Sequence, residues 1–465
     1  MRLTGLRRWM QANGVTHDVL LTNMRKSENG IGLFALQDLE PGQVIAEIPH
    51  TTCLSLVNST ALNILDVAES LECELHLPMA ILYEASLGPA SKWWAYLSAI
   101  GLEEGEPNVP LLWEDHLLEL LNGTGLEARE VRERREMLLD GVAELLEQAG
   151  EMAEEQGIEF EPAIIRFLDV LSSEPGRILY ADSLATSRGF NVGGEFGEVL
   201  LPFGDMLNHA CRRAPKEDED EEADAMMEMS EDEMEIVSLI DEDVGDDVPP
   251  MDATMVIRES TVQVMVMSPI QTGAEIMNTY GEYGNAELLQ KYGFVVPGNP
   301  FDTLYIDHGA AITVMQSTGI VSRRQMRKRL QFLFGHVAEE AGLKELVSES
   351  SEWRIDGQLP DGLCLLLFFS MIPEEAFTPY LSMDPETLAE ALHFIEETSV
   401  LEDTTMLQGL TTIIDGVHEA LDVSAISDDG HCDDSVSATA LSLASQLRAG
   451  ELRVAQYVRA ILGPV

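Results

Sequence analysis

Residues Leu200–His209, LLPFGDMLNH, end an apolar, strand-like run on an Asn-His pair. The amide of Asn208 and the ring nitrogens of His209 can hold an adenine edge, or they can fix a backbone crossing through hydrogen bonds. A buried polar pair with satisfied hydrogen bonds is the commoner arrangement for an isolated Asn-His dipeptide. No second histidine lies three to five residues away, so metal binding is poorly supported. The pair therefore predicts either a ligand contact or a structural crossing.

Two tyrosines follow further along the chain, each directly before a glycine. Residues Gly273–Gly281 read GAEIMNTYG, and residues Lys291–Phe294 read KYGF, so Tyr280 and Tyr292 lie twelve positions apart. Two phenol hydroxyls at this spacing can meet at one cavity, although tyrosines at strand ends are more often core or interface residues.

A third motif, NGIG, occupies residues Asn29–Gly32 near the start of the chain. A dinucleotide-binding fingerprint requires a third glycine and a following helix, but position 35 is Ala35 and the next segment is strand-like. If Gly30 and Gly32 bind a nucleoside, they do so by letting the backbone approach closely. A simple hairpin also uses glycines in this way.

In this order, the three motifs resemble the SET-domain protein methyltransferases. The closer match is to the branch typified by the Rubisco large-subunit lysine methyltransferase and the actin-histidine methyltransferase. The resemblance covers nearly the whole chain. Further matching stretches are Asp38–Gly42, Ser91–Leu97 (SKWWAYL), Pro110–Trp113, Ser187–Phe190 (SRGF) and Leu447–Glu451 (LRAGE).

The resemblance, with the alternation of apolar and helical segments, predicts an α+β fold. We expect an N-terminal helix at 1–18 and a β-rich SET domain at 19–300, which a helical insert at about 60–182 divides. An acidic disordered insert is expected at about 212–250. An all-α domain at 305–465, similar to the family's substrate-binding domain, would follow.

The resemblance also implies a cofactor and a set of site residues. Tyr280 matches the family's active-site tyrosine and is expected to be catalytic. The other matched positions would contact S-adenosylmethionine or line the cofactor and substrate pockets: Asn29, Gly30, Ile31, Asn208, His209, Arg188, Asp205 and Tyr292. No metal enters this chemistry.

The implied activity is methyl transfer to the nitrogen of a lysine in a non-histone or basic protein. Free lysine has a pKa near ~10.4, so the site must favour the neutral amine, and desolvation beside a cationic sulfonium does this. Methylation of a histidine is the nearest alternative. A non-catalytic module that keeps the fold and holds a basic protein is the alternative from another class.

Charge and cysteine content limit the partners. The 465 residues carry 82 Asp and Glu against 28 Lys and Arg, for a formal net charge of −54. Such a surface disfavours nucleic acid and anionic membranes and favours a basic protein. Residues 216–247 alone hold 17 acidic side chains and one Lys, a composition typical of disorder. The five scattered cysteines indicate a reducing compartment. We expect a monomer in the cytoplasm or nucleus, with a plastid as the alternative location.

Overall fold

The computed structural model describes residues 2–17, 21–27, 30–59, 75–101, 108–155, 159–194, 196–211, 251–317, 322–343, 347, 350–354, 359–392, 395, 400–421 and 435–462. The chain forms two compact units. The first unit comprises Met1–Trp113, Glu130–Glu282 and Gln290–Gly293, and the second comprises Glu114–Arg129, Tyr283–Leu289 and Phe294–Val465. The expected acidic insert at about 212–250 lies outside the described residues.

The first unit contains an antiparallel four-stranded sheet in the order β1-β4-β9-β8. Alternate residues of β9, Val262, Val264 and Val266, are buried in the core, as expected for a sheet with one covered face. Two hairpins, β2–β3 and β5–β6, complete the main strands of this unit. The bounds are β1 Thr16–His17, β2 Thr22–Ser27, β3 Gly30–Ala35, β4 Val44–Pro49, β5 Gly189–Asn191, β6 Glu198–Leu200, β8 Ala253–Ile257 and β9 Thr261–Val266.

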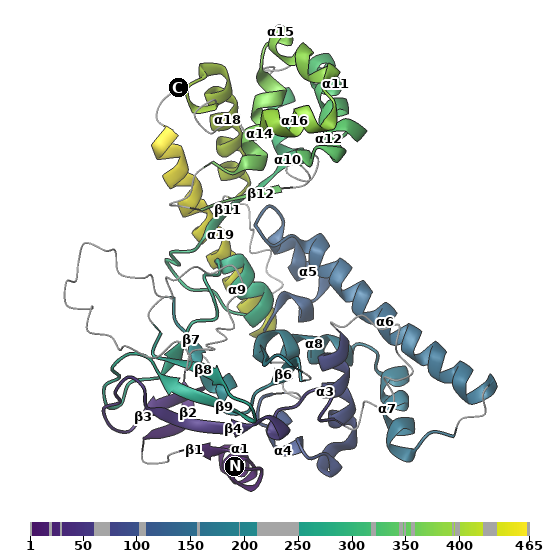
Figure 1. Ribbon diagram of the computed structural model, residues 1–465, viewed down its shortest axis with the longest axis vertical. Coiled ribbons are helices and arrows are strands. Elements are labelled where there is room, and N and C mark those ends of the chain that lie inside the picture. The colour runs from purple at the N-terminus through teal and green to yellow at the C-terminus, as the bar shows by residue number, and fades with distance from the viewer. Residues whose placement is uncertain are drawn as a thin grey trace. The chain divides into compact units, whose positions relative to one another are not determined.

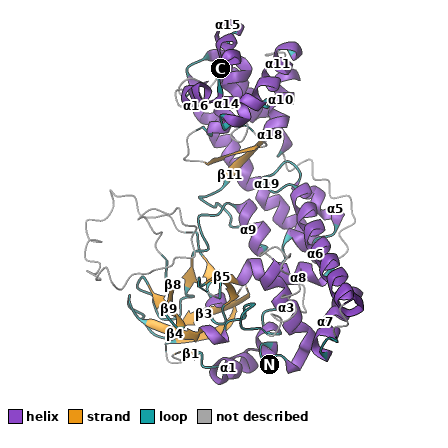
Figure 2. Ribbon diagram, turned by 45° about the vertical axis from the view of Figure 1, so that its right-hand side comes forward, coloured by secondary structure: helices purple, strands orange, loops and turns teal. Residues whose placement is uncertain are grey.

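Helices of the same unit lie beside these strands (Figure 2). The long helix α6 turns one apolar stripe inward, because Val131, Leu138, Val142, Leu145 and Ala149 are all buried. Helix α3 packs against α7 and α8. The bounds are α1 Arg2–Ala12, α3 His76–Leu87, α4 Trp94–Leu97, α6 Ala128–Glu155, α7 Pro162–Ser173 and α8 Arg177–Arg188, with 3₁₀ turns η1 His50–Thr52, η3 Gly88–Ala90, η4 Pro110–Leu112 and η6 Gly204–Met206.

The segment that carries the Asn-His pair crosses the segment that leads to Tyr280. Strand β7 (Asn208–His209) pairs in parallel with β10 (Met277–Asn278), with His209 opposite Asn278. Just before this crossing, Phe203 has φ 83° and ψ −48°, and it is the one non-glycine residue with positive φ in the described part of the chain. Such a backbone costs ~1–3 kcal/mol and persists where the surroundings fix it. Here the surroundings do so, because Phe203 is fully buried and its ring packs against His17.

The second unit is mostly helical and has its own apolar core, in which α14 is buried along most of its length (Figure 1). The bounds are α5 Asp115–Leu118, η5 Glu119–Leu121, α10 His308–Ser317, α11 Arg323–Leu333, α12 His336–Glu340, α14 Asp361–Met371, α15 Glu374–Phe377, η9 Thr378–Ser382, α16 Pro385–Leu392, α18 Thr404–Ala420 and α19 Ser435–Leu462. Helix α9, Asn285–Tyr292, crosses from this unit into the first.

The expectation of an all-α C-terminal domain is wrong in one respect. Strands β11 (Thr303–Asp307) and β12 (Ser350–Arg354) form an antiparallel pair in which Leu304, Ile306, Ser351 and Trp353 are buried. Each strand is five residues long. A period-two pattern this short is easily overlooked beside longer helical stripes.

Residues 114–129, which run into the first turn of α6, belong to the second unit. The guanidinium of Arg448, on α19, donates hydrogen bonds to the carbonyls of Leu120 (3.1 Å) and Asn122. Glu451, one turn further along α19, accepts a hydrogen bond from the backbone N–H of Gly125 at 2.7 Å. The LRAGE motif therefore attaches this early segment to the last helix.

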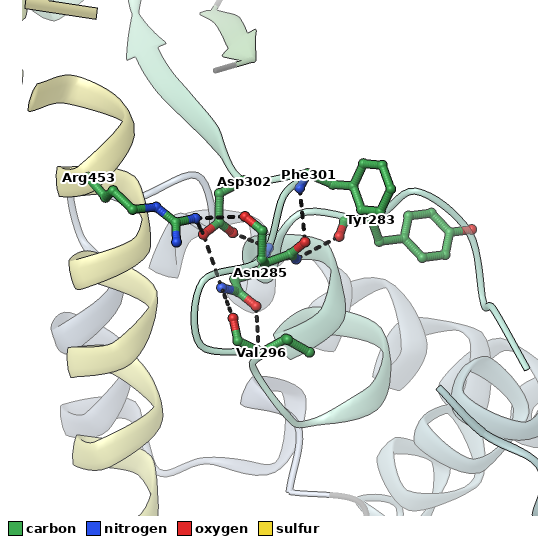
Figure 3. Close-up of polar contacts among 7 residues, drawn as sticks. Tyr283, Asn285, Val296, Phe301, Asp302 and Arg453 are labelled. Atoms are coloured by element: carbon green, nitrogen blue, oxygen red, sulfur yellow. Dashed lines mark hydrogen bonds and ion pairs between the residues drawn. The ribbon is translucent and has the colours of Figure 1, made fainter. Parts of the chain in front are cut away.

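A polar cluster inside the second unit surrounds Asp302 (Figure 3). Asp302 accepts hydrogen bonds from the backbone N–H of Asn285 (3.0 Å), from Asn285 Nδ2 (3.2 Å) and from Arg453 Nη2 (3.0 Å). Asn285 also donates to the carbonyl of Val296 and accepts from its N–H. This cluster fixes the loops around the start of α9.

Among the described residues, no single helix is long and apolar enough to cross a membrane, although the bent pair Asp361–Met371 and Glu374–Ser382 passes that test by length and composition. No group of three His, Cys, Asp or Glu side chains in the described part of the chain could hold a metal ion.

Candidate active site

Tyr280 follows β10 and is held at both its backbone and its hydroxyl. Its N–H donates to Nδ1 of His209 at 3.0 Å, and its hydroxyl donates to the carbonyl of Leu207 at 3.0 Å. Its ring lies against the rings of Tyr292 (centroids 4.5 Å apart) and His209 (5.1 Å). Burial raises the pKa of Tyr280 to about 12. The phenol is therefore neutral near pH 7 and acts as a fixed polar group, not as a base.

His209 serves as an acceptor toward that tyrosine. Because Nδ1 accepts the N–H of Tyr280, the ring proton of the neutral imidazole is assigned to Nε2, which lies 3.1 Å from Sγ of Cys211. Burial lowers the pKa of His209 to about 4, so the ring is uncharged at neutral pH. Its role in this arrangement is to position the backbone next to Tyr280.

Asn208 faces Glu275 and the backbone of β3. Its Nδ2 donates to Oε1 of Glu275 at 2.6 Å. A Cβ placed on Gly32 would lie 2.1 Å from that oxygen and 3.2 Å from Asn208 Nδ2. An alanine at position 32 would therefore require the Glu275 carboxylate to move. This close neighbour is a protein side chain, so the nucleoside contact suggested for the NGIG glycines stays a prediction.

Arg188, Asp205 and Tyr96 form a second polar group of the same unit. Arg188 Nη1 donates to the carbonyl of Asp205 (3.0 Å) and to its Oδ2 (3.3 Å), and the hydroxyl of Tyr96 donates to Oδ2 at 2.9 Å. The Asp205 side chain is fully buried, whereas Arg188 remains 27% exposed. Burial raises the pKa of Asp205, and Arg188 and Tyr96 oppose that rise.

One oxygen of this group has no hydrogen-bond donor. Oδ1 of Asp205 is buried, and no residue in the described ranges bonds to it. A buried acceptor without a donor is costly. Because the side chain of Asp205 is enclosed by protein, the partly exposed guanidinium of Arg188 is the part of this group that a bound molecule could reach. The partly exposed Arg188 and the tilted ring pair of Tyr280 and Tyr292 belong to the same surroundings, since the charge of Arg188 also acts on the pKa of Tyr280.

The structure brings together most of the residues that the sequence singled out. Asn208, His209, Arg188, Asp205, Tyr280 and Tyr292 lie in this part of the first unit. Gly30 and Ile31 lie on β3, while Asn29 lies outside the described residues. Their contacts to a cofactor remain predictions.

Two residues of the site were missed. Tyr96 and Glu275 lie inside stretches that had been quoted for the resemblance, SKWWAYL and GAEIMNTYG. Tyr96 bonds to Asp205, 109 positions away, and Glu275 bonds to Asn208, 67 positions away. Nothing in the local sequence of either residue showed these contacts. Their polar side chains in otherwise apolar stretches were the available signal.

Comparisons with known proteins agree with this architecture. Ribosomal lysine N-methyltransferase 3 of Saccharomyces cerevisiae is 24% identical over 328 residues, covering 60% of this chain and 59% of that protein. N-lysine methyltransferase SETD6 of Rattus norvegicus is 24% identical over 318 residues (65% and 56%), and the Xenopus laevis protein is 26% identical over 338 residues (68% and 64%). The chain thus spans less than two thirds of the length of these curated relatives. No family model matches.

Solved structures resemble the whole chain more completely. Rubisco LSMT bound to AdoMet has a TM-score of 0.61 at 17% identity, covering 99% of this chain and 91% of that one. The SET domain of LSMT bound to lysine and AdoHcy has a TM-score of 0.59 at 16% identity, covering 99% and 90%. The resemblance predicted from the sequence is therefore confirmed at the level of the fold: the chain has the fold of the Rubisco LSMT structures, including that of the LSMT SET domain.

Proposed function

We propose that this chain is an S-adenosylmethionine-dependent protein-lysine N-methyltransferase acting on a non-histone or basic protein. The observation that carries the proposal is the neutral Tyr280 beside Asn208 and His209. Its hydroxyl is held by the carbonyl of Leu207, and its ring packs against the rings of His209 and Tyr292. Its relatives are lysine methyltransferases, and the solved LSMT structures hold AdoMet, AdoHcy or sinefungin.

The residues present fit such a cofactor. When bound, it would supply a methyl group on a positively charged sulfur. The faces of Tyr280 and Tyr292 attract cations, and the carboxylates of Asp205 and Glu275 add negative charge nearby. Gly32 leaves β3 free of a side chain at the crossing.

Methyl transfer forms a carbon–nitrogen bond and breaks a carbon–sulfur bond, and the amine must offer a lone pair. No strong base is needed if the amine arrives neutral. The described site contains none in a suitable state, because His209 uses Nδ1 on the N–H of Tyr280 and its pKa is about 4. Burial among aromatic side chains favours the neutral amine. Tyr280 would align it, and most of the rate gain would come from positioning.

Lysine is preferred over histidine because the curated relatives quoted above are named as lysine methyltransferases. The intact cluster of Tyr280, Asn208 and His209 favours an enzyme over a binding module that has lost activity. The net charge of −54 favours a substrate with a basic target region and disfavours nucleic acid and membrane surfaces.

Location and assembly are also proposals. Cys53, Cys211 and Cys364 form no disulfide in the described part of the chain, which supports a reducing compartment such as the cytoplasm or nucleus. A plastid remains the alternative location. We propose a monomer.

Two measurements test the proposal. Calorimetry with S-adenosylmethionine and with its demethylated product should show binding, and each ligand should raise the Tm by mass action. Incubation with labelled cofactor and a protein extract, followed by mass spectrometry, should then locate the label on lysine. Absence of binding by both ligands would contradict the enzyme. Label on histidine would show that the enzyme methylates histidine and not lysine, and it would leave the fold and the cofactor unchanged.

A further inference from the structure

Helix α11 has a composition opposite to that of the rest of the chain. Its sequence, RRQMRKRLQFL over Arg323–Leu333, contains five basic residues and no acidic one. In the whole chain the acidic residues outnumber the basic ones by 82 to 28. A helix of this length with this charge is therefore a local exception that needs a physical reason.

Two of the five cations are used within the second unit. Arg329 is buried and donates to the backbone carbonyls of Ser370 and, at 2.6 Å, Ile372. Lys328 pairs with Glu374, and this hydrogen bond lowers the pKa of that carboxyl. These two side chains attach α11 to the end of α14 and the start of α15.

The other three, Arg323, Arg324 and Arg327, are exposed. Their guanidinium groups form no hydrogen bond or ion pair with another residue in the part of the chain that the structure describes. Arg323 and Arg327 are one helical turn apart, so their like charges repel each other on the same face. The fold gains nothing from these charges.

That face of α11 is hollowed. Arg323 and Arg327 line an open cleft of about 440 Å³ together with Gln316, Leu330 and Gln331. The helical period continues the face to Phe334, whose side chain is 41% exposed. This surface has two arginines at one end, glutamine side chains in the middle and the apolar Leu330 and Phe334 at the other end. We call this surface, with its cleft, the α11 cleft.

We propose that the α11 cleft binds an acidic segment of a protein partner that also presents an apolar side chain. The unpaired guanidiniums suit carboxylates, which they can bind with two parallel hydrogen bonds. Leu330 and Phe334 suit an aliphatic or aromatic side chain. This goes beyond the proposed function, because the partner has the opposite charge to the basic target region expected at the methylation site.

A protein segment fits better than nucleic acid for two reasons. Repulsion by the net charge of −54 grows with the charge of the approaching molecule, and a nucleic acid carries a phosphate at every nucleotide. Leu330 and Phe334 also offer no partner to a phosphate backbone. A short acidic segment has few charges and can use the apolar end of the cleft.

The test uses the full chain and an array of short peptides in which Glu and Asp are combined with Leu and Phe at varied spacings. Each peptide is paired with a copy in which Gln and Asn replace the acids, and single-stranded RNA of equal charge is included. Acidic peptides should bind, and added salt should weaken the binding. The amide copies and the RNA should bind more weakly.

The decisive variant is Arg323→Glu with Arg327→Glu. Acidic residues near a helix N-terminus are compatible with the helix dipole, so α11 should still form, which circular dichroism can verify. Peptide binding should fall by roughly tenfold or more, because each reversal replaces an attraction with a repulsion. The matched control is Arg8→Glu with Arg166→Glu, two exposed residues of α1 and α7 that give the same change in net charge.

The outcomes are distinct. Lack of peptide binding by the unmodified chain, equal loss in the control, or tighter binding of RNA would each overturn the proposal. Peptide binding is measured without cofactor, so its result does not depend on whether the chain transfers methyl groups. A failed cofactor titration would contradict the proposed function and leave the α11 cleft untouched.

Discussion

Two buried aspartates, one in each unit, are both paired with an arginine, but they differ in what remains unsatisfied. Asp302 in the second unit has donors at both carboxylate oxygens (Figure 3). Asp205 in the first unit has donors only at Oδ2, from Arg188 and Tyr96, and Oδ1 has none in the described ranges. The carboxylate of Asp302 is therefore saturated and that of Asp205 is not, although the Asp302 cluster also keeps one buried atom without a partner in those ranges, Nε of Arg453. Each such atom calls for a physical explanation.

The neighbouring glycines show the same contrast. Gly450 leaves room for Asp302, since a Cβ there would lie 2.6 Å from Oδ2, and so it completes the structural cluster. Gly32 leaves room for Glu275 and Asn208 at the crossing where a cofactor is proposed. A glycine required by close approach is thus no indicator of function until its neighbours are known.

The largest expected effect is on the structural cluster. Asp302→Ala should lower the free energy of unfolding by ~1–3 kcal/mol for each buried donor that loses its acceptor, which are the N–H and Nδ2 of Asn285. Arg453 also loses a partner, but its side chain is 40% exposed and can be hydrated. Denaturant unfolding measures this. Asp415→Ala is the matched control, since its pair with Arg459 is exposed and should contribute at most about 1 kcal/mol. Equal losses of stability in the two variants would show that the buried Asp302 cluster contributes no more than the exposed pair of Asp415 and Arg459.

One part of the pH dependence of stability should come from Glu451, beside that cluster. Burial raises its pKa to about 8 from a usual value of 4.5. The folded state therefore keeps a proton that the unfolded state has lost, so stability is greatest below the lower value and falls as the pH rises toward about 8.

Glu451→Gln tests this, because a glutamine oxygen can still accept the N–H of Gly125. In the variant, stability should decrease less as the pH rises. At the alkaline end of the range the variant should be more stable than the unmodified chain by roughly a few kcal/mol. Unfolding curves over that pH range provide the measurement. An unchanged slope would show that other groups cause the pH dependence.

A smaller effect is expected at the crossing. Gly32→Ala should cost about 1 kcal/mol of stability, because the carboxylate of Glu275 must move and its hydrogen bond with Asn208 is lost. Gly150→Ala is the control. Nothing lies within 4 Å of the added carbon inside α6, so alanine should stabilise by roughly 0.5–1 kcal/mol. Thermal melts of both variants should therefore shift in opposite directions, and a shared direction would contradict the assigned packing.

The sequence was sufficient for features that lie within one short stretch. The alternation of apolar and helical segments predicted an α+β fold, and the structure contains both strands and helices. The motif residues Tyr280, His209 and Asn208 were found because each lies in a recognisable stretch. The fold itself followed from the order of those stretches.

What the sequence missed depends on contacts between distant segments. Tyr96 reaches Asp205 across 109 positions and Glu275 reaches Asn208 across 67, and neither distance is encoded in a local period. The pairing of β11 with β12 has the same origin, since two five-residue strands become visible only when they meet. The basic residues of α11 can be read from the sequence, but the sequence does not show that three of its arginines have no acidic partner in the described part of the chain.

The central claim is that the Tyr280 hydroxyl aligns the reacting groups, and Tyr280→Phe tests it most directly. Single-turnover methyl transfer on a substrate found by the labelling experiment should fall by ~10²–10³, since a positioned polar group has that effect when removed. The cofactor Kd should stay unchanged, and stability should fall by only ~0.5–1.5 kcal/mol through the lost bond to Leu207. Tyr180→Phe, on the exposed face of α8, should change none of these quantities. Methyl transfer at the unmodified rate in the Tyr280 variant would contradict the account and would show that Tyr280 is a structural residue of the core.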